Sequence, residues 1–171
     1  MDERRAPDDA FPSSVCRAFL LKLGRTPDKK MKRRIIAACI NVPRPWSEEL
    51  LWETLADPNE GIRDLVVKEL CRRPSLHPEW AARRLCLPPW YARSSALTVI
   101  GYRRLYTALP EVGKAADDPN VEVRRATAAA LGELGGEEAV RILVRLKKDV
   151  SPYVRAAAEE AIAKTSGLRI T

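Results

Sequence analysis

Five arginines recur along the chain at a spacing of 30 or 31 residues. Self-similarity at such a period is the signature of a repeat protein, in which each copy is one small supersecondary unit. The chain is rich in arginine, so the neighbouring columns decide whether the spacing has meaning. The column seven residues after each arginine is aliphatic in all five copies. The arginines are Arg33, Arg63, Arg93, Arg124 and Arg155, and the aliphatic column holds Ile40, Leu70, Ile100, Leu131 and Ile162.

The columns around each arginine have the spacing of one face of an α-helix. The residues one before, three after and seven after the arginine are separated by four, and positions so spaced lie on the same side of a helix. The residue before the arginine is apolar in all copies except the first, where it is Lys32. An aspartate six residues before the arginine marks the start of the helix. These aspartates are Asp57, Asp118 and Asp149.

Shorter amphipathic segments lie between these helices, such as the stripe of Ala139, Ile142, Leu143 and Leu146. One helix pair cannot bury its own apolar face, so stacked neighbours must supply the core. The sequence therefore predicts an all-α fold, a right-handed α-solenoid of about five helix pairs. We expect a single domain over residues 11–171, preceded by a charged, disordered segment over residues 1–10. The expected helices are 13–23, 28–40, 47–56, 59–71, 78–86, 89–102, 106–116, 120–134, 137–147 and 151–164.

The clearest copy of the repeat runs from Asp118-Pro119-Asn120 through Arg124-Arg125 to Leu134-Gly135. This pattern resembles the HEAT repeat, and specifically the HEAT-like repeat named after phycobilisome lyases. The resemblance is strong over residues 117–164, fair over 56–71 and weak before 45. It implies that the turn aspartates and the helix arginines hydrogen-bond within and between repeats, as a structural ladder. The ladder comprises Asp57, Arg63, Asp118, Arg124, Asp149 and Arg155.

Two departures from the repeat mark candidate binding residues. Arg93 has Leu87 where the aspartate should stand, so we expect Arg93 either to find another acid or to contact a partner. Trp90, just before the apolar stripe, is the best candidate for an exposed aromatic hot spot. The resemblance also implies that the second helix of each pair lines a concave face. Lys30, Arg34 and Arg125 would lie on that face, where a basic surface suits an anionic partner.

Composition excludes several classes of function. No segment approaches the ~18 apolar residues of a membrane span, and the N-terminus lacks a signal-peptide core, so we expect a cytoplasmic protein. The four cysteines show no CxxC spacing and the one histidine, His77, lies between loop residues. The sequence therefore offers no metal, cofactor or catalytic constellation, and we expect no enzyme.

Three functions remain. The first is a scaffold that binds another protein on the concave face. The second is nucleic-acid binding, because the net charge is +7 and certain alkylation-repair DNA glycosylases resemble this architecture. Their catalytic residues have no match in this sequence. The third is a role like that of the bilin lyases, which share the repeat.

Overall fold

The computed structural model describes residues 14–40, 42 and 44–167, and within them every regular element is helical. All ten expected helices are present, and their ends differ from the expected ones by three residues or fewer. The elements are α1 (Ser14–Gly24), α2 (Lys29–Ile40), α3 (Pro45–Thr54), α4 (Glu60–Arg72), α5 (Pro78–Leu85), α6 (Trp90–Arg103), the 3-10 helix η1 (Tyr106–Ala108), α7 (Leu109–Ala115), α8 (Val121–Leu134), α9 (Gly136–Leu146) and α10 (Pro152–Gly167).

The chain divides into two compact units, Met1–Leu51 and Trp52–Thr171, which we call unit 1 and unit 2. A single domain over residues 11–171 stays a prediction, and the segment 1–10 lies outside the described residues. In unit 1, α1 and α2 bury Cys16, Leu23, Ile36 and Cys39. The ring of Phe19 stacks on Trp46, with 5.1 Å between the centroids.

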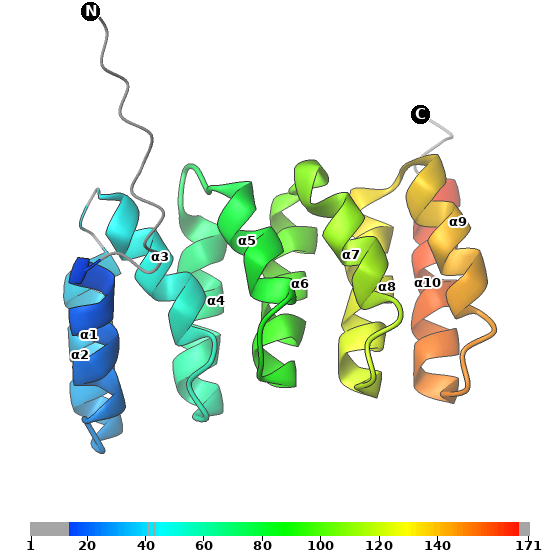
Figure 1. The fold of residues 1–171 in the computed structure, drawn as a ribbon. Helices are drawn as coiled ribbons and strands as arrows, with labels where there is room; N and C mark the ends of the chain where they lie inside the picture. Colours follow the sequence, from blue (N-terminus) through cyan, green and yellow to red (C-terminus); the bar gives the residue numbers. More distant parts are fainter. Residues whose placement is uncertain (1–13, 41, 43, 168–171) are drawn as a thin grey trace, which may run out of the picture. The chain divides into compact units, whose positions relative to one another are not determined.

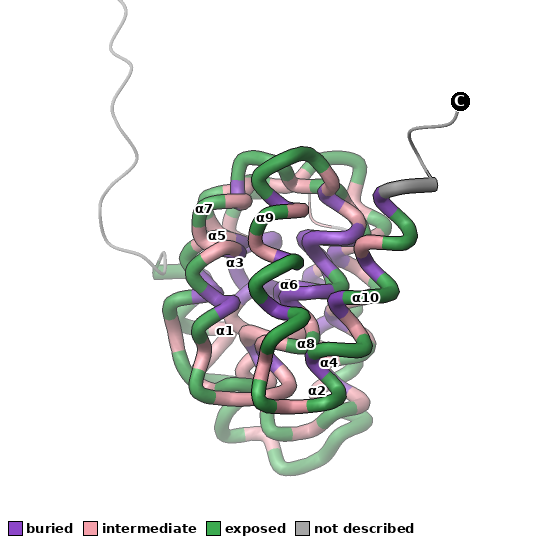
Figure 2. The backbone as a smooth tube through the Cα atoms, turned by 90° about the vertical axis from the view of Figure 1, so that its right-hand side faces the viewer, coloured by how far each residue is buried: buried purple, intermediate pink, exposed green. Residues whose placement is uncertain are grey.

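Unit 2 repeats one arrangement, in which the second helices of successive pairs pack side by side. Helix α6 packs between α4 and α8, and α8 packs between α6 and α10, while α5, α7 and α9 form a parallel row (Figure 1). The buried positions recur along these helices, whereas the turns between them are mostly exposed or half-buried (Figure 2). The expected column forms the core in three repeats, where Leu70, Ile100 and Leu131 are all 0% exposed, while Ile40 and Ile162 are half-buried. The fold is an all-α solenoid.

Glycine allows the second helices to approach closely. A Cβ built on Gly132 of α8 would lie 2.8 Å from the Cβ of Ala161 in α10. A Cβ on Gly101 of α6 would lie 3.0 Å from the Cα of Ala130 in α8. Each pair of helices therefore meets backbone to backbone near its C-terminal half, which fixes the register of their exposed faces.

One element differs from its expected form. The segment 106–116 begins as η1 and becomes α-helical only at Leu109. Pro110 explains the difference, because a proline lacks the backbone N–H that a continuous helix would use and is tolerated only in the first turn. Among the described residues, none of the helices has both the length and the apolar content needed to cross a membrane.

Candidate functional site

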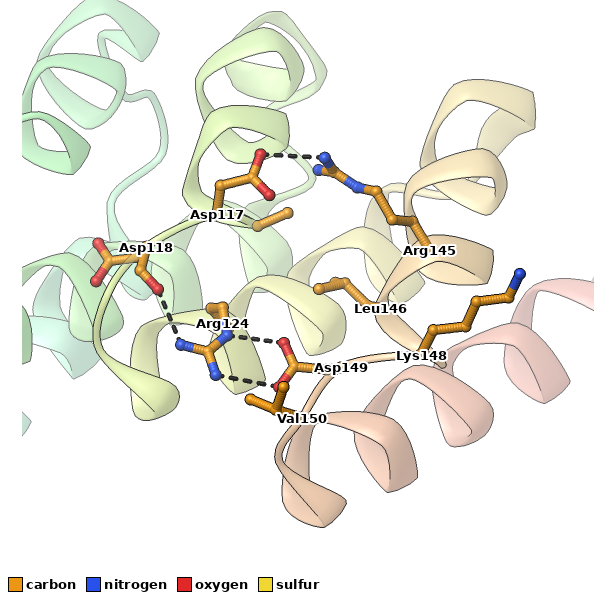
Figure 3. Close-up of a pocket in the computed structure, with 9 residues that line it drawn as sticks. Asp117, Asp118, Arg124, Arg145, Leu146, Lys148, Asp149 and Val150 are labelled. Atoms are coloured by element: carbon orange, nitrogen blue, oxygen red, sulfur yellow. Dashed lines mark hydrogen bonds and ion pairs between the residues drawn. The ribbon is translucent and has the colours of Figure 1, made fainter.

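The ladder residues form bidentate ion pairs between successive repeats. Arg124 donates from Nε and Nη2 to the two carboxylate oxygens of Asp149, at 2.8 and 3.1 Å (Figure 3). Arg93 holds Asp118 in the same way, at 2.7 and 3.0 Å. All four side chains are largely buried, between 8% and 16% exposed. Charge-assisted pairs with two parallel hydrogen bonds are strong and directional, so each one fixes a repeat against the next.

Backbone contacts fix the same groups within each repeat. Nη1 of Arg124 donates to the carbonyls of Asp118 and Pro119, at 2.9 and 3.3 Å. The carboxylate of Asp149 accepts from the N–H of Ser151 at 2.8 Å, which closes the turn before α10. The hydrogen bond from Arg124 lowers the pKa of Asp149, and the bond to Asp149 raises the pKa of Arg124. Both groups are therefore held in their charged forms.

The direction of these pairs changes the interpretation of the missing aspartate at position 87. Arg93 and Arg124 each take their carboxylate from the following repeat, not from their own turn. Arg93 is therefore paired with Asp118 although its own turn carries Leu87. Arg63 is the residue that loses its acid, and its guanidinium lies over the ring of Tyr91, 4.5 Å from the centroid. The resemblance implied hydrogen bonds within and between repeats, but it did not say which aspartate each arginine holds.

A buried arginine lies behind the same turn. Arg84 is 3% exposed; it donates to the carbonyl of Pro88, and its Nη1 lies 3.6 Å from Glu53. Its Nε is buried without a hydrogen-bond partner. Burial lowers the pKa of Arg84, the nearby Glu53 opposes this, and Arg93 lowers the pKa further. The charges that act on Arg84 are therefore of both signs, and the carboxylate of Glu53 acts more strongly than the guanidinium of Arg93.

A groove of about 310 Å³ lies between the exposed sides of α6 and α8. Its floor consists of small or apolar residues, and Tyr102 rises from it with 71% of its surface exposed. Arg125 borders the groove and is 51% exposed, paired with Glu122 on its own helix at 2.8 Å. Glu133 borders the other end and pairs with Lys164 of α10. The groove residues are Ser94, Leu97, Thr98, Gly101, Tyr102, Arg125, Ala126, Ala129, Ala130 and Glu133.

The candidate binding residues fall in three separate places. Arg125 borders the groove, and Trp90 is 43% exposed at the start of α6, where its ring meets Tyr91 edge-on. The guanidinium of Arg93 is occupied by Asp118, so we leave Arg93 out of the candidate surface. Lys30 and Arg34 belong to unit 1, where both are exposed on α2.

A second hollow, of about 500 Å³, lies beside the last ladder pair and is lined by charged turn residues (Figure 3). Arg145 crosses it to Asp117, with 3.1 Å between Nη1 and Oδ2. Most charges in this hollow are paired, Asp117 with Arg145 and Arg124 with Asp149, which is the arrangement of a structural joint. Arg155 repeats the backbone contacts of Arg124, at 2.9 and 3.1 Å, but it is exposed and has no carboxylate partner among the described residues.

Comparison with known proteins places the fold. The sequence model described as HEAT repeats matches residues 78–163, which are 86 of the 171 residues. No curated protein matches the chain. A designed armadillo repeat protein, solved in complex with the peptide (KR)4, is similar in structure, with a TM-score of 0.50 and 17% identity over 89% of this chain and 82% of that one. The match over half of its length shows that this chain belongs to the HEAT repeat family.

Proposed function

We propose that the chain is a protein-interaction scaffold that binds a segment of a partner protein along the exposed sides of α6 and α8. The groove between these helices carries the proposal. It combines an apolar floor with an exposed tyrosine and a bordering arginine. Tyrosine and arginine are two of the residue types that most often dominate binding energy at interfaces. The packing of α6 and α8 through Gly101 makes the groove a rigid feature of the fold.

The family supports the same function at a coarser level. A solenoid of stacked helix pairs presents an extended surface, and such surfaces are used for binding. The similar designed armadillo repeat protein is in complex with a basic peptide. The groove of this chain is bordered by both a cation and an anion, Arg125 and Glu133. The partner of this chain therefore need not be basic like that peptide.

The test uses a substitution that fills the groove without disturbing the core. Ala129 lies exposed on α8 at the floor of the groove, so Ala129→Trp should block the partner while the protein stays folded. The wild-type chain and the variant would be compared in quantitative co-purification from native lysate. We expect at least a tenfold loss of the stoichiometric partner. Circular dichroism and the thermal midpoint should be unchanged.

Ala163→Trp is the matched control, because Ala163 is also exposed but lies on α10 outside the groove. It should retain the partner. Equal retention by both variants would show that the groove is not the binding site.

Nucleic-acid binding is the second candidate, favoured by the basic start of α2. Lys29, Lys30 and Arg34 are all exposed there. Binding to phosphates would make the affinity for duplex DNA fall steeply with salt concentration. Fluorescence anisotropy between 50 and 200 mM salt tests it, and absence of binding at the lower concentration rejects it. A bilin-lyase-like role is the third candidate and is tested by incubation with a bilin and its acceptor protein.

A further inference from the structure

Arg63 keeps the backbone half of the ladder contact and lacks the carboxylate half. Its Nη1 donates to the carbonyls of Asp57 and Pro58, both at 3.0 Å. These contacts match those of Arg124, so they hold the guanidinium in place. In Arg93 and Arg124, Nε and Nη2 grip an aspartate of the next repeat. In Arg63 the same two atoms meet no carboxylate among the described residues, because the next turn carries Leu87 and Pro88 instead.

The carboxylates near the turn before α6 are already paired with other arginines. The charges that act on Arg84 are the carboxylate of Glu53 and the guanidinium of Arg93. The carboxylates of Glu53 and Asp118 are already engaged by Arg84 and Arg93. Arg84 also has an unsatisfied, buried Nε, and a buried guanidinium with incomplete partners is costly. Arg84 is only 3% exposed, so an incoming acid would meet the half-buried Arg63 and not Arg84.

The same turn presents aromatic surface. Tyr91 lies beneath the guanidinium of Arg63, and the ring of Trp90 meets Tyr91 at 5.7 Å with an interplanar angle of 77°. Trp90 is 43% exposed. Tryptophan, tyrosine and arginine are the residue types most enriched at binding hot spots, and here Arg63 and Trp90 both contact Tyr91.

We propose that this place, formed by Arg63, Leu87, Trp90 and Tyr91 and called the third-turn slot, binds a carboxylate side chain of the partner protein. The proposal rests on the proposed scaffold function and extends it to the partner's chemistry. The partner's aspartate or glutamate takes the role that Asp118 and Asp149 have in the next two repeats. It accepts two hydrogen bonds from Nε and Nη2 of Arg63, while Trp90 covers the apolar part of the partner segment.

A carboxylate is favoured over a phosphate because the two equivalent arginines hold planar carboxylates through two parallel hydrogen bonds. That geometry matches the fork of a guanidinium. The aromatic cover also suits a protein segment, whose apolar side chains flank its charges.

The test uses ¹⁵N-labelled protein and the Nε–H signals of its arginines, titrated with N-acetyl-aspartate N-methylamide. We expect a saturable shift of the Arg63 Nε–H and of the Trp90 indole N–H. The Arg124 signal should not move, because its place is occupied by Asp149. Arg155 has the same backbone contacts and no carboxylate, but it lacks the Tyr91 ring, so it reports the binding of the probe to such a guanidinium alone. Parallel titration of Arg63 and Arg155, or tighter binding of inorganic phosphate than of the aspartate probe, would overturn the proposal.

Leu87→Asp supplies the missing acid within the chain. It should weaken probe binding at Arg63 at least tenfold, because the slot is then filled. Leu87→Asn is the matched control, which has nearly the same shape without the charge, and it should keep the binding. Both variants leave the core untouched, since Leu87 is only half-buried. Wild-type-like probe binding by Leu87→Asp would show that the slot does not exist.

These experiments can reject the third-turn slot and the scaffold function independently of each other. If Ala129→Trp loses the partner and Leu87→Asp keeps it, the groove stands and the slot is wrong. If probe binding depends on residue 87 but the wild-type chain recovers no partner that Ala129→Trp loses, the slot stands as a carboxylate site and the scaffold proposal is wrong.

Discussion

At the scale of single residues, the Arg124–Asp149 pair links the repeat pattern to stability. Asp149→Asn keeps the shape of the side chain and removes its charge. Hydrogen bonds to charged groups contribute about 1.5–3 kcal/mol, and the pair is largely buried. We expect the free energy of unfolding at pH 7 to fall by about 1–3 kcal/mol, measured by urea denaturation.

The contribution of Asp149 should depend on pH in one direction. Its pKa is lower in the folded chain than in the unfolded chain, where an aspartate carboxyl has a pKa of about 4. The stabilisation is therefore fully present above that value and is lost as the pH falls through the lowered folded pKa. The stability difference between wild type and Asp149→Asn should shrink from pH 6 to pH 2.5. A difference that stays constant over this range would contradict the ionic role of the pair.

Leu87→Asp should stabilise the folded chain as well as close the third-turn slot. The new carboxylate would meet the unfilled side of Arg63, as Asp118 meets Arg93. We expect a gain of about 1 kcal/mol in the free energy of unfolding, with Leu87→Asn close to wild type. Adding Arg63→Lys should remove most of the gain, because lysine cannot form the paired hydrogen bonds. A gain that survives Arg63→Lys would have another origin.

At the scale of residues, the ladder arginines could be predicted from the sequence, but the ion pairs that they form could not. The spacing picks out Arg63, Arg93 and Arg124 because repetition is visible in one dimension. It does not reveal that Arg93 and Arg124 reach 25 residues forward, to Asp118 and Asp149, since that contact arises from how repeats stack. Nothing in the sequence marked Arg84 as buried, because in an arginine-rich chain a buried arginine cannot be told from the exposed ones.

At the scale of helices, the approach of α8 to α10 depends on Gly132. An alanine there would place its Cβ 2.8 Å from that of Ala161, closer than van der Waals contact allows. Forcing extra volume into a packed contact costs about 1–3 kcal/mol, more than the helix propensity that alanine adds, about 1 kcal/mol. We expect Gly132→Ala to lower the thermal midpoint, and Ala161→Gly to offset part of that loss in the double variant.

Gly113→Ala provides the comparison within α7. Its Cβ would meet only the end of the Ile142 side chain, at 3.2 Å, and a flexible side chain can move aside. This variant should be neutral or slightly stabilising. If both alanine variants behave alike, the backbone contact between α8 and α10 is not what makes Gly132 necessary.

Helices were the most predictable level, because the apolar stripe and the turn residues act locally. The stripe of Ile62, Val66 and Leu70 places α4 and its buried face correctly. The groove between α6 and α8 was not predictable in the same way. It forms where Gly101, Ala126 and Ala130 happen to leave space between two packed helices, and small residues occur throughout an alanine-rich chain.

At the scale of the whole molecule, the two units follow from an uneven repeat. The resemblance to the repeat is weak before residue 45 and strong over 117–164, and the HEAT model match begins at residue 78. In unit 1 the apolar column is broken by Lys32, and cations at the start of α2 oppose its helix dipole. In unit 2, α8 buries seven residues, including Leu131 and Leu134.

This contrast predicts a gradient of local stability along the chain. Repeat arrays are stabilised by each repeat and by its contacts with neighbours, and weakly packed elements open with lower free energy than the core. Hydrogen exchange at pH 7 should therefore show α2 amides exchanging at least a hundredfold faster than those in the middle of α8. Lys32→Ile, which restores the apolar column, should slow exchange in α2 and leave α8 unchanged. Equal protection of α2 and α8 in the wild-type chain would mean that the whole array opens as one cooperative unit.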